Sequence, residues 1–275
     1  MNKPRRALAG CRGFTLIEAI VVIVITGILS TVVAVFIRAP ITGYFDSVRR
    51  AELTDAADTA LRRIARDVRT ALPNSLRTTS PASSSCFEFL PTVGGGRYRA
   101  ALRSAGTGDI LDFSIADTSF DVLANAKLPP TPGFGAATYH AVIYNLGISG
   151  ANAYNSVDQN RTQIGGASTA ANITIAANKF PFESPGKRFH VIPDYSVAYS
   201  CTGGNLIWST QAISATPLAA CPAAGTVLVS NVSACTFSYT PAVSARNGLL
   251  TITLVLTQSG ESVQIYQEVH VNNVP

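Results

Sequence analysis

Apolar positions are concentrated near the N-terminus of the chain. Residues 14–37 are apolar except at six positions, which are Thr15, Glu18, Thr26, Gly27, Ser30 and Thr31. A helix of this length extends roughly 36 Å, which is enough to cross the hydrocarbon core of a bilayer. The pattern therefore predicts a membrane-spanning helix.

A second helical pattern begins beyond Pro40. Its apolar positions recur every three or four residues and lie on one helix face; they are Leu53, Ala57, Leu61, Ile64, Val68 and Leu72. The Pro73-Asn74-Ser75 sequence is expected to end this helix. The opposite face is charged and includes Arg62, Arg66 and Arg69. These arginines form either a solvated face or a surface for a partner subunit.

From residue 78 onward the composition and pattern are those of β-structure. The clearest alternation lies at residues 250–257 and 262–271, on either side of a turn that contains Gly260, and it predicts a β-hairpin. Weaker strands are expected at residues 86–90, 110–114, 140–144, 172–176, 196–200, 206–209, 226–230 and 235–239. Residues 147–184 are rich in Asn, Ala and Gly, and we expect large loops there.

These patterns predict an α+β protein with a long N-terminal α-helical stalk and a β-rich C-terminal head. We divide the chain into a leader at residues 1–13, a stalk helix at residues 14–77 and a globular head at residues 78–275. The stalk is expected to be transmembrane over residues 14–37. Its second half is expected to pack its apolar stripe on the head.

The net charge of +5 comes mostly from the first thirteen residues. They hold Lys3, Arg5, Arg6 and Arg12 and no acid, so the remainder has 21 − 4 = 17 basic against 16 acidic residues. This distribution argues against a nucleic-acid partner, which requires basic residues on a folded face. Basic residues before an apolar helix predict a cytoplasmic leader and an exported head, in a single-pass membrane protein.

Three classes of N-terminal segment compete. A cleaved secretory signal requires a small-residue site after the apolar stretch, but Arg38-Ala39-Pro40 follows it. A lipoprotein signal would end at Cys11, but only a short basic segment precedes Leu8-Ala9-Gly10-Cys11. The third class, a functional membrane segment, is indicated by Glu18, because a carboxylate inside a spanning helix costs about 3 kcal/mol or more without a partner. An uncleaved anchor with an accidental Glu is the simplest alternative to it.

The sequence Gly13-Phe14-Thr15-Leu16-Ile17-Glu18, behind a short basic leader, resembles the signal of type IV prepilins and type II secretion pseudopilins. The resemblance implies that a prepilin peptidase cuts between Gly13 and Phe14 and methylates the new N-terminus. It also implies that Glu18 pairs with the terminal ammonium of a neighbouring pilin subunit, in assembly and not in catalysis. Two positions depart from the family: Ala19 replaces a larger apolar residue, and Val35 replaces a common proline. We therefore expect the helix either to bend at Pro40 instead or to melt differently within a filament.

Further segments narrow the resemblance. They lie at residues 44–63, 72–75, 89–99, 231–235 and 268–275, and are similar to the MshO family of MSHA pilus biogenesis proteins. That family consists of minor pilin-like proteins distantly similar to J-type pseudopilins, which implies a fold of that kind and a place in a priming complex at the filament tip. The Asn/Ala-rich middle of the chain shows no such similarity.

Four cysteines lie in the exported part of the chain: Cys86, Cys201, Cys221 and Cys235. An even number in an oxidising compartment predicts two disulfides, with three possible pairings. We expect Cys201–Cys221 and Cys86–Cys235. The spacing argues against a zinc site, because the sequence has no CxxC.

The search for other chemistry yields weak candidates. Asp109, Asp112, Asp117 and Asp121 could hold Ca²⁺, but they lack the spacing of a calcium loop, and turn carboxylates are the favoured explanation. Gly94-Gly95-Gly96 is interpreted as a glycine-rich turn, without the Lys-Ser/Thr of a phosphate loop. No catalytic motif is recognisable, so we expect neither an enzyme nor a cofactor. The predicted function is a minor pilin-like assembly subunit, and the alternative is a membrane-tethered or pilus-borne adhesin or ligand-binding domain.

Overall fold

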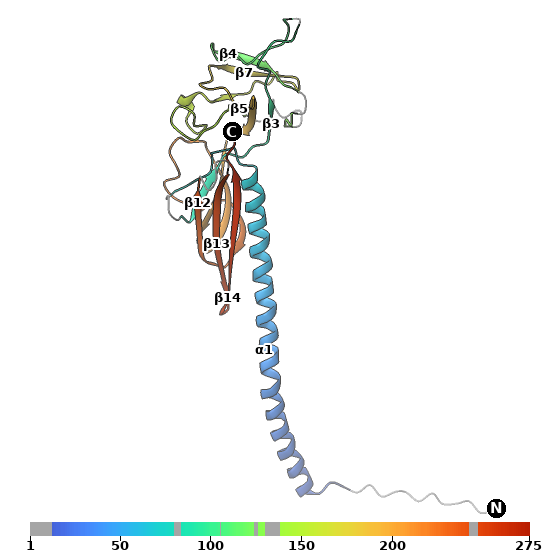
Figure 1. Cartoon of the computed structure of the whole chain (residues 1–275). Coiled ribbons are helices and arrows are strands. Elements are labelled where there is room, and N and C mark those ends of the chain that lie inside the picture. The colour runs from blue at the N-terminus through green and yellow to red at the C-terminus, as the bar shows by residue number, and fades with distance from the viewer. Residues whose placement is uncertain (1–12, 80–83, 105, 124–125, 130–137, 242–246) are drawn as a thin grey trace, which may run out of the picture. The chain divides into compact units, whose positions relative to one another are not determined.

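The computed structural model describes residues 13–79, 84–104, 106–123, 126–129, 138–241 and 247–275. The chain forms two compact units, an N-terminal unit at Met1–Ala51 and a C-terminal unit at Glu52–Pro275. One long helix followed by antiparallel sheets confirms the predicted α+β class (Figure 1).

Helix α1 runs over Leu16–Arg69, 54 residues in all. It continues through Pro40. Proline has no N–H and therefore removes one helical hydrogen bond, but this loss does not end the helix. It ends at Arg69, before the expected Pro73-Asn74-Ser75 sequence, and Arg66 and Arg69 lie in its last turn. Positive charge there is favourable because the C-terminal end of a helix is negative.

Within the C-terminal unit, the apolar stripe of α1 is buried as predicted. Leu61, Ile64 and Val68 are each 1% exposed or less and belong to a core cluster that also contains Phe87, Tyr199, Phe237 and Leu250. Full burial of a side chain of this kind contributes about 1.5–3 kcal/mol. The hydroxyl of Tyr199 donates a hydrogen bond of 2.6 Å to Oδ2 of Asp67 on the helix. Burial, together with this carboxylate, raises the pKa of Tyr199, so the phenol keeps its proton.

Two antiparallel sheets share this core with the helix. The first has the order β1-β2-β9-β10-β11 and consists of β1 (Arg77–Thr78), β2 (Cys86–Phe89), β9 (Ser196–Thr202), β10 (Asn205–Gln211) and β11 (Thr226–Ser230). The second has the order β12-β13-β14 and consists of β12 (Val232–Thr240), β13 (Asn247–Gln258) and β14 (Glu261–Asn272). β13 and β14 pair from Asn247↔Asn272 to Gln258↔Glu261, which confirms the predicted hairpin.

Two smaller sheets enclose a second core. One has the order β3-β8-β5-β6 and the other pairs β4 with β7. Their strands are β3 (Gly94–Arg97), β4 (Asp117–Asp121), β5 (Tyr139–Ile143), β6 (Arg161–Gln163), β7 (Asn172–Asn178) and β8 (Arg188–Pro193), and a short 3₁₀ helix, η1, lies at Ser156–Asp158. Tyr98, Phe120 and Phe189 are among the residues of their core.

Two expectations for this region are wrong. Residues 110–114 form no strand, and the strand follows at β4. The stretch 147–184 contains loops as expected, and it also holds β6 and β7, of which β7 covers the strand predicted at residues 172–176. The glycine run at residues 94–96 is part of strand β3 and not a turn, because the segment at Lys127 packs directly against it: a Cβ on Gly94 would lie 2.5 Å from the Lys127 carbonyl oxygen.

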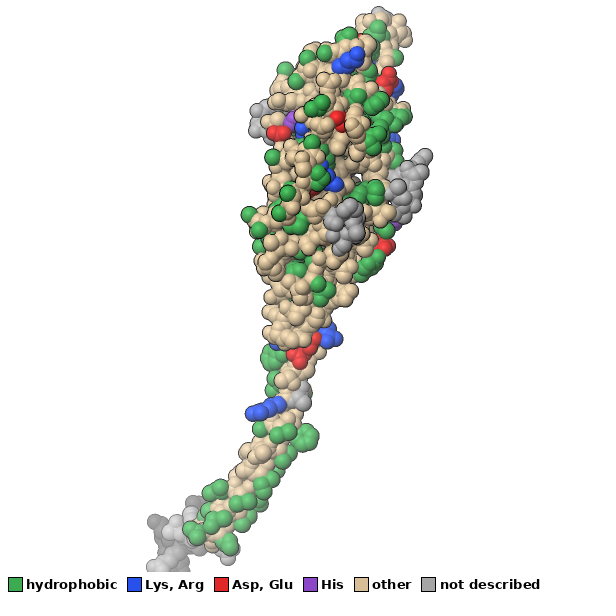
Figure 2. All heavy atoms as spheres, turned by 90° about the vertical axis from the view of Figure 1, so that its left-hand side faces the viewer, with side chains coloured by type: hydrophobic (Ala, Val, Ile, Leu, Met, Phe, Trp, Pro, Cys, Tyr) green, Lys and Arg blue, Asp and Glu red, His purple; other side chains and the backbone are tan. Residues whose placement is uncertain are grey.

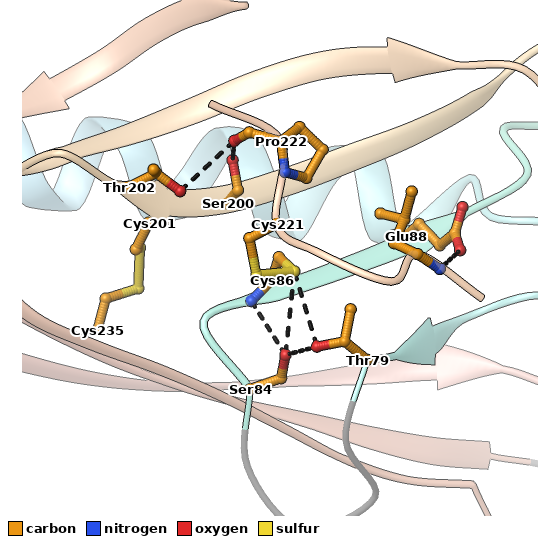
Figure 3. Close-up of a disulfide and its surroundings, with 11 residues drawn as sticks. Thr79, Ser84, Cys86, Glu88, Ser200, Cys201, Thr202, Cys221, Pro222 and Cys235 are labelled. Atoms are coloured by element: carbon orange, nitrogen blue, oxygen red, sulfur yellow. Dashed lines mark hydrogen bonds between the residues drawn. A yellow bond between two sulfur atoms is a disulfide. The ribbon is translucent and has the colours of Figure 1, made fainter. Parts of the chain in front are cut away.

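The cysteines form two disulfides, but the predicted pairing is wrong. The bonds join Cys86 to Cys221 and Cys201 to Cys235 (Figure 3). Cys86 lies opposite Ser200 in the β2–β9 register, so the next residue, Cys201, faces the other side of the sheet. On the core side, Cys201 reaches Cys235 of β12, whereas Cys86 reaches Cys221 in the loop between β10 and β11.

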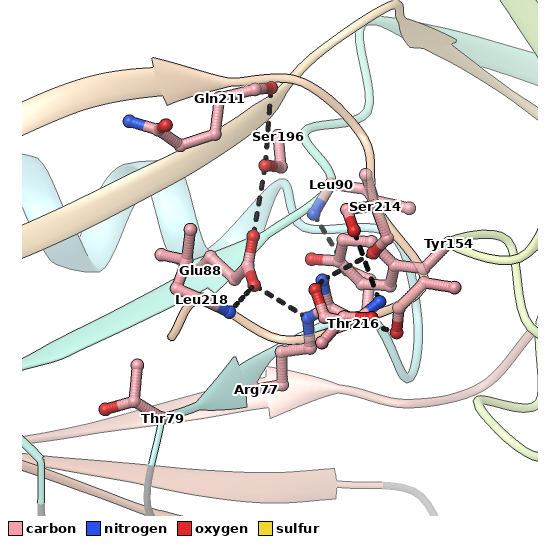
Figure 4. Close-up of polar contacts among 12 residues, drawn as sticks. Arg77, Thr79, Glu88, Leu90, Tyr154, Ser196, Gln211, Ser214, Thr216 and Leu218 are labelled. Carbon is pink, nitrogen blue, oxygen red and sulfur yellow. Dashed lines mark hydrogen bonds and ion pairs between the residues drawn. The ribbon is translucent and has the colours of Figure 1, made fainter. Parts of the chain in front are cut away.

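A buried ion pair holds the same loop on the outer face of the first sheet (Figure 4). The Glu88 carboxylate accepts hydrogen bonds from Arg77 Nε at 2.8 Å, from Ser196 Oγ at 3.1 Å and from Leu218 N–H at 3.2 Å. The Arg77 guanidinium also donates to the carbonyl of Ser214 at 2.7 Å. Both charges are therefore satisfied, which a buried pair requires in order not to destabilise the fold.

Candidate processing and assembly segment

The predicted processing residues precede α1. Gly13 has a backbone φ outside the left-handed region, and a Cβ built on it would meet nothing within 4 Å. The side chain of Phe14 is 76% exposed. Nothing within the described chain therefore requires glycine at position 13, and a requirement for it has to come from a molecule that acts on this segment.

Thr15 and Glu18 form the beginning of the helix. The Glu18 N–H donates to Thr15 Oγ1 at 3.3 Å, and Ala19 N–H donates to the Thr15 carbonyl at 3.1 Å. This is the threonine half of a capping box, in which Thr occupies the N-cap and Glu the third helical position. A carboxylate in the first turn is stabilised by the positive end of the helix dipole. The local fold thus places Glu18 one turn from the predicted new N-terminus.

The helix of the N-terminal unit leaves its apolar side chains uncovered (Figure 2). Large apolar residues of α1 that are at least 47% exposed are Leu16, Ile17, Ile20, Val21, Val22, Ile23, Val24, Ile25, Ile28, Leu29, Val32, Val33, Val35, Phe36, Ile37, Ile41, Tyr44 and Phe45. By length and composition, α1 contains a segment able to cross a membrane, and none of that segment is buried inside the protein. An uncovered apolar surface of this extent indicates a membrane or other subunits as its environment.

Hydroxyl groups within this segment are satisfied by the helix itself. Thr26 Oγ1 donates to the Val22 carbonyl at 2.7 Å, and Ser30 Oγ donates to the Thr26 carbonyl at 2.7 Å. Such internal bonds make these residues compatible with lipid. Glu18 is the single charged residue in the sequence between Phe14 and Ile37. Its carboxylate has no bonding partner among the residues that the structure describes, and it is therefore the group that requires one from outside.

The predicted partner face of the stalk is exposed. Arg62 Nε donates to Asp58 Oδ2 at 2.7 Å, and Arg66 and Arg69 are exposed residues of the last turn. An exposed pair at this spacing contributes only about 0.3–0.5 kcal/mol. The role of Arg62, Arg66 and Arg69 in binding a partner stays a prediction.

The four aspartates suggested for Ca²⁺ accept hydrogen bonds from other groups of the protein. Asp109 Oδ2 accepts from Ser119 Oγ at 2.6 Å, and Asp117 Oδ2 accepts from the Asp112 N–H at 2.7 Å. The side-chain and backbone donors of Ser114 lower the pKa of Asp112, and the backbone N–H of Asp109 lowers that of Asp121. Over the described ranges, no three His, Cys, Asp or Glu side chains lie close enough to hold a metal ion.

The comparison with family models matches the N-terminal segment. Residues 8–34 match the prokaryotic N-terminal methylation motif. The comparisons with curated proteins and with solved structures gave no match. The matched stretch contains Gly13, Phe14 and Glu18 and runs into the uncovered apolar helix. The chain therefore carries the N-terminal methylation motif of prokaryotic pilin-like proteins, which supports a type IV pilin or pseudopilin that is processed by a prepilin peptidase.

Proposed function

We propose that this protein is a minor pilin-like subunit that a prepilin peptidase cleaves between Gly13 and Phe14 and methylates at Phe14. It inserts in the inner membrane with its head in the periplasm, and then joins other pilin subunits in an MSHA-type pilus. The observation that carries the proposal is the methylation motif followed directly by a helix whose apolar side chains have no cover within the chain. The finer assignment, to the MshO family, rests on the sequence resemblance.

Glu18 supplies the specificity of assembly in this proposal. Its carboxylate lies in the first turn of α1, close to where cleavage would create an ammonium group on Phe14. Inside a membrane, an ammonium from the neighbouring subunit would neutralise this charge. The apolar surface supplies cohesion, and the ion pair sets the register of neighbouring helices. The protein thus acts in assembly and not in catalysis.

Mass spectrometry of the N-terminus of the membrane-extracted protein tests the processing step. The expected mature chain begins with N-methylated Phe14. A mature chain that begins with Met1, or with a lipidated Cys11, would contradict the proposal.

A pair of variants at Gly13 identifies what the peptidase recognises. Gly13→Leu should remain uncut, because a bulky side chain keeps the scissile bond out of the peptidase site. Gly13→Ala is the matched control, since it adds only a Cβ, and the chain has room for one there. Both variants should insert and form the same disulfides, so a failure of Gly13→Leu to be cut reports on recognition and not on folding. Complete cleavage of both variants would contradict the assigned role of Gly13.

A further inference from the structure

A cavity of about 300 Å³ lies in the C-terminal unit, where α1 ends. Its walls come from the end of the helix, the segment before β3, strand β8 and the end of β14. The polar lining residues considered below are Arg69, Thr92, Lys127, Arg188, His190 and Asn272. Pockets that bind small organic molecules begin at about this volume. The cavity is therefore large enough for an ion with an organic group attached.

The charge around this cavity has one sign. Arg69, Lys127 and Arg188 line it, and no Asp or Glu does. Among the residues that the structure describes, none of these three cations forms an ion pair with an acidic side chain. Like charges that surround one cavity repel each other and raise its positive potential. An anion in the cavity would remove this repulsion.

His190 lies in the cavity wall but adds no charge to it. Burial, with a smaller contribution from the charge of Arg188, lowers the pKa of His190 to about 4. The imidazole is thus neutral at pH 7. Its Nε2, like Thr92 Oγ1, is closed to solvent and makes no hydrogen bond within the described chain. The charged groups available to a ligand in the cavity are therefore the three cations.

Backbone pairing holds two of these cations in defined positions. Arg188 and His190 are two residues apart on β8 and point to the same side of the strand. The Lys127 backbone is fixed beside Gly95, through Gly95 N–H to the Lys127 carbonyl at 2.6 Å and Lys127 N–H to the Gly95 carbonyl at 2.9 Å. The glycine run permits this close approach. The glycines that the sequence presented as a turn therefore serve to position a cavity lysine.

We propose that this cavity binds a small ligand through a tetrahedral oxyanion, namely a phosphate or sulfate group. Three cations line the space, and their N–H donors are more than the two oxygens of a carboxylate can use. A phosphate offers more acceptor oxygens and carries up to two negative charges near pH 7. The cavity also has apolar walls at Val93 and Val274, which suit an organic group attached to the oxyanion.

Isothermal titration of the detergent-solubilised full chain tests the ligand class. The probes are inorganic phosphate, glucose 6-phosphate, acetate and glucose, in buffers free of other oxyanions. We expect saturable binding of one or both phosphates, at least about tenfold weaker binding of acetate and none of glucose. Tighter binding of glucose 6-phosphate would assign the site to an ester, and tighter or equal binding of inorganic phosphate to the free ion. Acetate that binds as tightly as phosphate, or no saturable binding at all, would overturn the proposal.

Variants then locate the site. Arg188→Gln and Lys127→Gln should each weaken phosphate binding at least about tenfold, because each removes a charge-assisted hydrogen bond. Both side chains are exposed, so their replacement leaves the fold intact. Arg103→Gln is the matched control, an exposed arginine outside the cavity that should change affinity by less than about twofold. Equal weakening by all three variants would show unspecific attraction and overturn the site.

Discussion

At the scale of one residue, the position of Glu18 allows its carboxylate to serve assembly without a role in folding. Its side chain is exposed in the N-terminal unit, and the core clusters of the C-terminal unit are built from described residues at position 53 and beyond. The helix start requires only the backbone N–H of Glu18, which Thr15 Oγ1 accepts. The carboxylate is thus available for a partner.

We therefore expect Glu18→Ala to be inserted, cleaved and disulfide-bonded like the parent but to be absent from filaments. Alanine keeps the helix, since its helix propensity is the highest of all residues. Immunoblots of sheared pili and of membrane fractions measure the two outcomes separately. Thr26→Ala, which removes an internally bonded hydroxyl of the same segment, is the control and should assemble. Incorporation of Glu18→Ala at the parental level would show that the carboxylate is not an assembly contact.

His190 links one buried side chain to the pH dependence of stability. Its pKa is about 4 in the folded chain, against an ordinary value of 6.5. Between these values, the unfolded chain binds a proton that the folded chain does not, so stability decreases as the pH decreases. The decrease from this residue is at most about 1.4 kcal/mol per pH unit. Burial also lowers the pKa of His140, which acts in the same direction.

We expect His190→Gln to flatten the decrease in unfolding free energy between pH 6.5 and pH 4. Urea unfolding of the full chain in detergent, without phosphate or sulfate, measures it through the fluorescence of Trp208, the single tryptophan of the sequence. His270→Gln is the control, because His270 is exposed. Parallel pH profiles for His190→Gln and the parent would contradict the assignment to His190.

At the scale of elements, the sequence correctly predicted the elements that are marked by a repeating hydrophobic pattern over a sufficient length. The stripe of α1 and the hairpin β13–β14 follow from repeating patterns, and both are confirmed. The irregular features were missed. Strand β3 contains three glycines and has no alternation to detect, and β4 carries two aspartates that resemble a turn.

The cavity and the disulfide pairing could not be predicted for a related reason. Lys127 and Arg188 are 61 residues apart in sequence (188 − 127 = 61). They line the same cavity because both of their backbone segments pair with β3. The disulfide partner of Cys86 depends on which face of the sheet each cysteine occupies. The register between β2 and β9 decides this, and it cannot be deduced from the number of residues between the cysteines. By contrast, the processing segment is a local motif, so the sequence alone indicated it.

The two disulfides should differ in their effect on stability. Cys86–Cys221 links residues 135 apart and Cys201–Cys235 links residues 34 apart. The chain-entropy model gives about 5 kcal/mol for the first and about 4 kcal/mol for the second. We expect the double variant Cys86→Ser/Cys221→Ser to lose more unfolding free energy than Cys201→Ser/Cys235→Ser, as measured by urea unfolding. Non-reducing peptide mapping of the parent checks the pairing itself, and a peptide that joins Cys201 to Cys221 would contradict it.

At the scale of the whole molecule, the two units have opposite relations to their surroundings. The C-terminal unit buries three apolar clusters of its own, whereas the helix in the N-terminal unit leaves its apolar side chains exposed. One unit is complete as a folded body, and the other requires cover by lipid or by neighbouring helices. This division is what a protein requires if it resides first in a membrane and then in a filament.

The size of the C-terminal unit leads to a prediction about its place in the filament. It spans residues 52–275 and contains several sheets as well as loops. A filament built from closely packed helices leaves each head limited lateral room, so a bulky head fits best at an end. We therefore expect a low-copy subunit that primes assembly at the tip, with the face of Arg62, Arg66 and Arg69 against another minor subunit. Deletion should sharply reduce the number of pili and change the length of the remaining ones little. Quantitative proteomics of sheared pili measures the copy number, and a value comparable to that of the major subunit would be incompatible with a place at the tip.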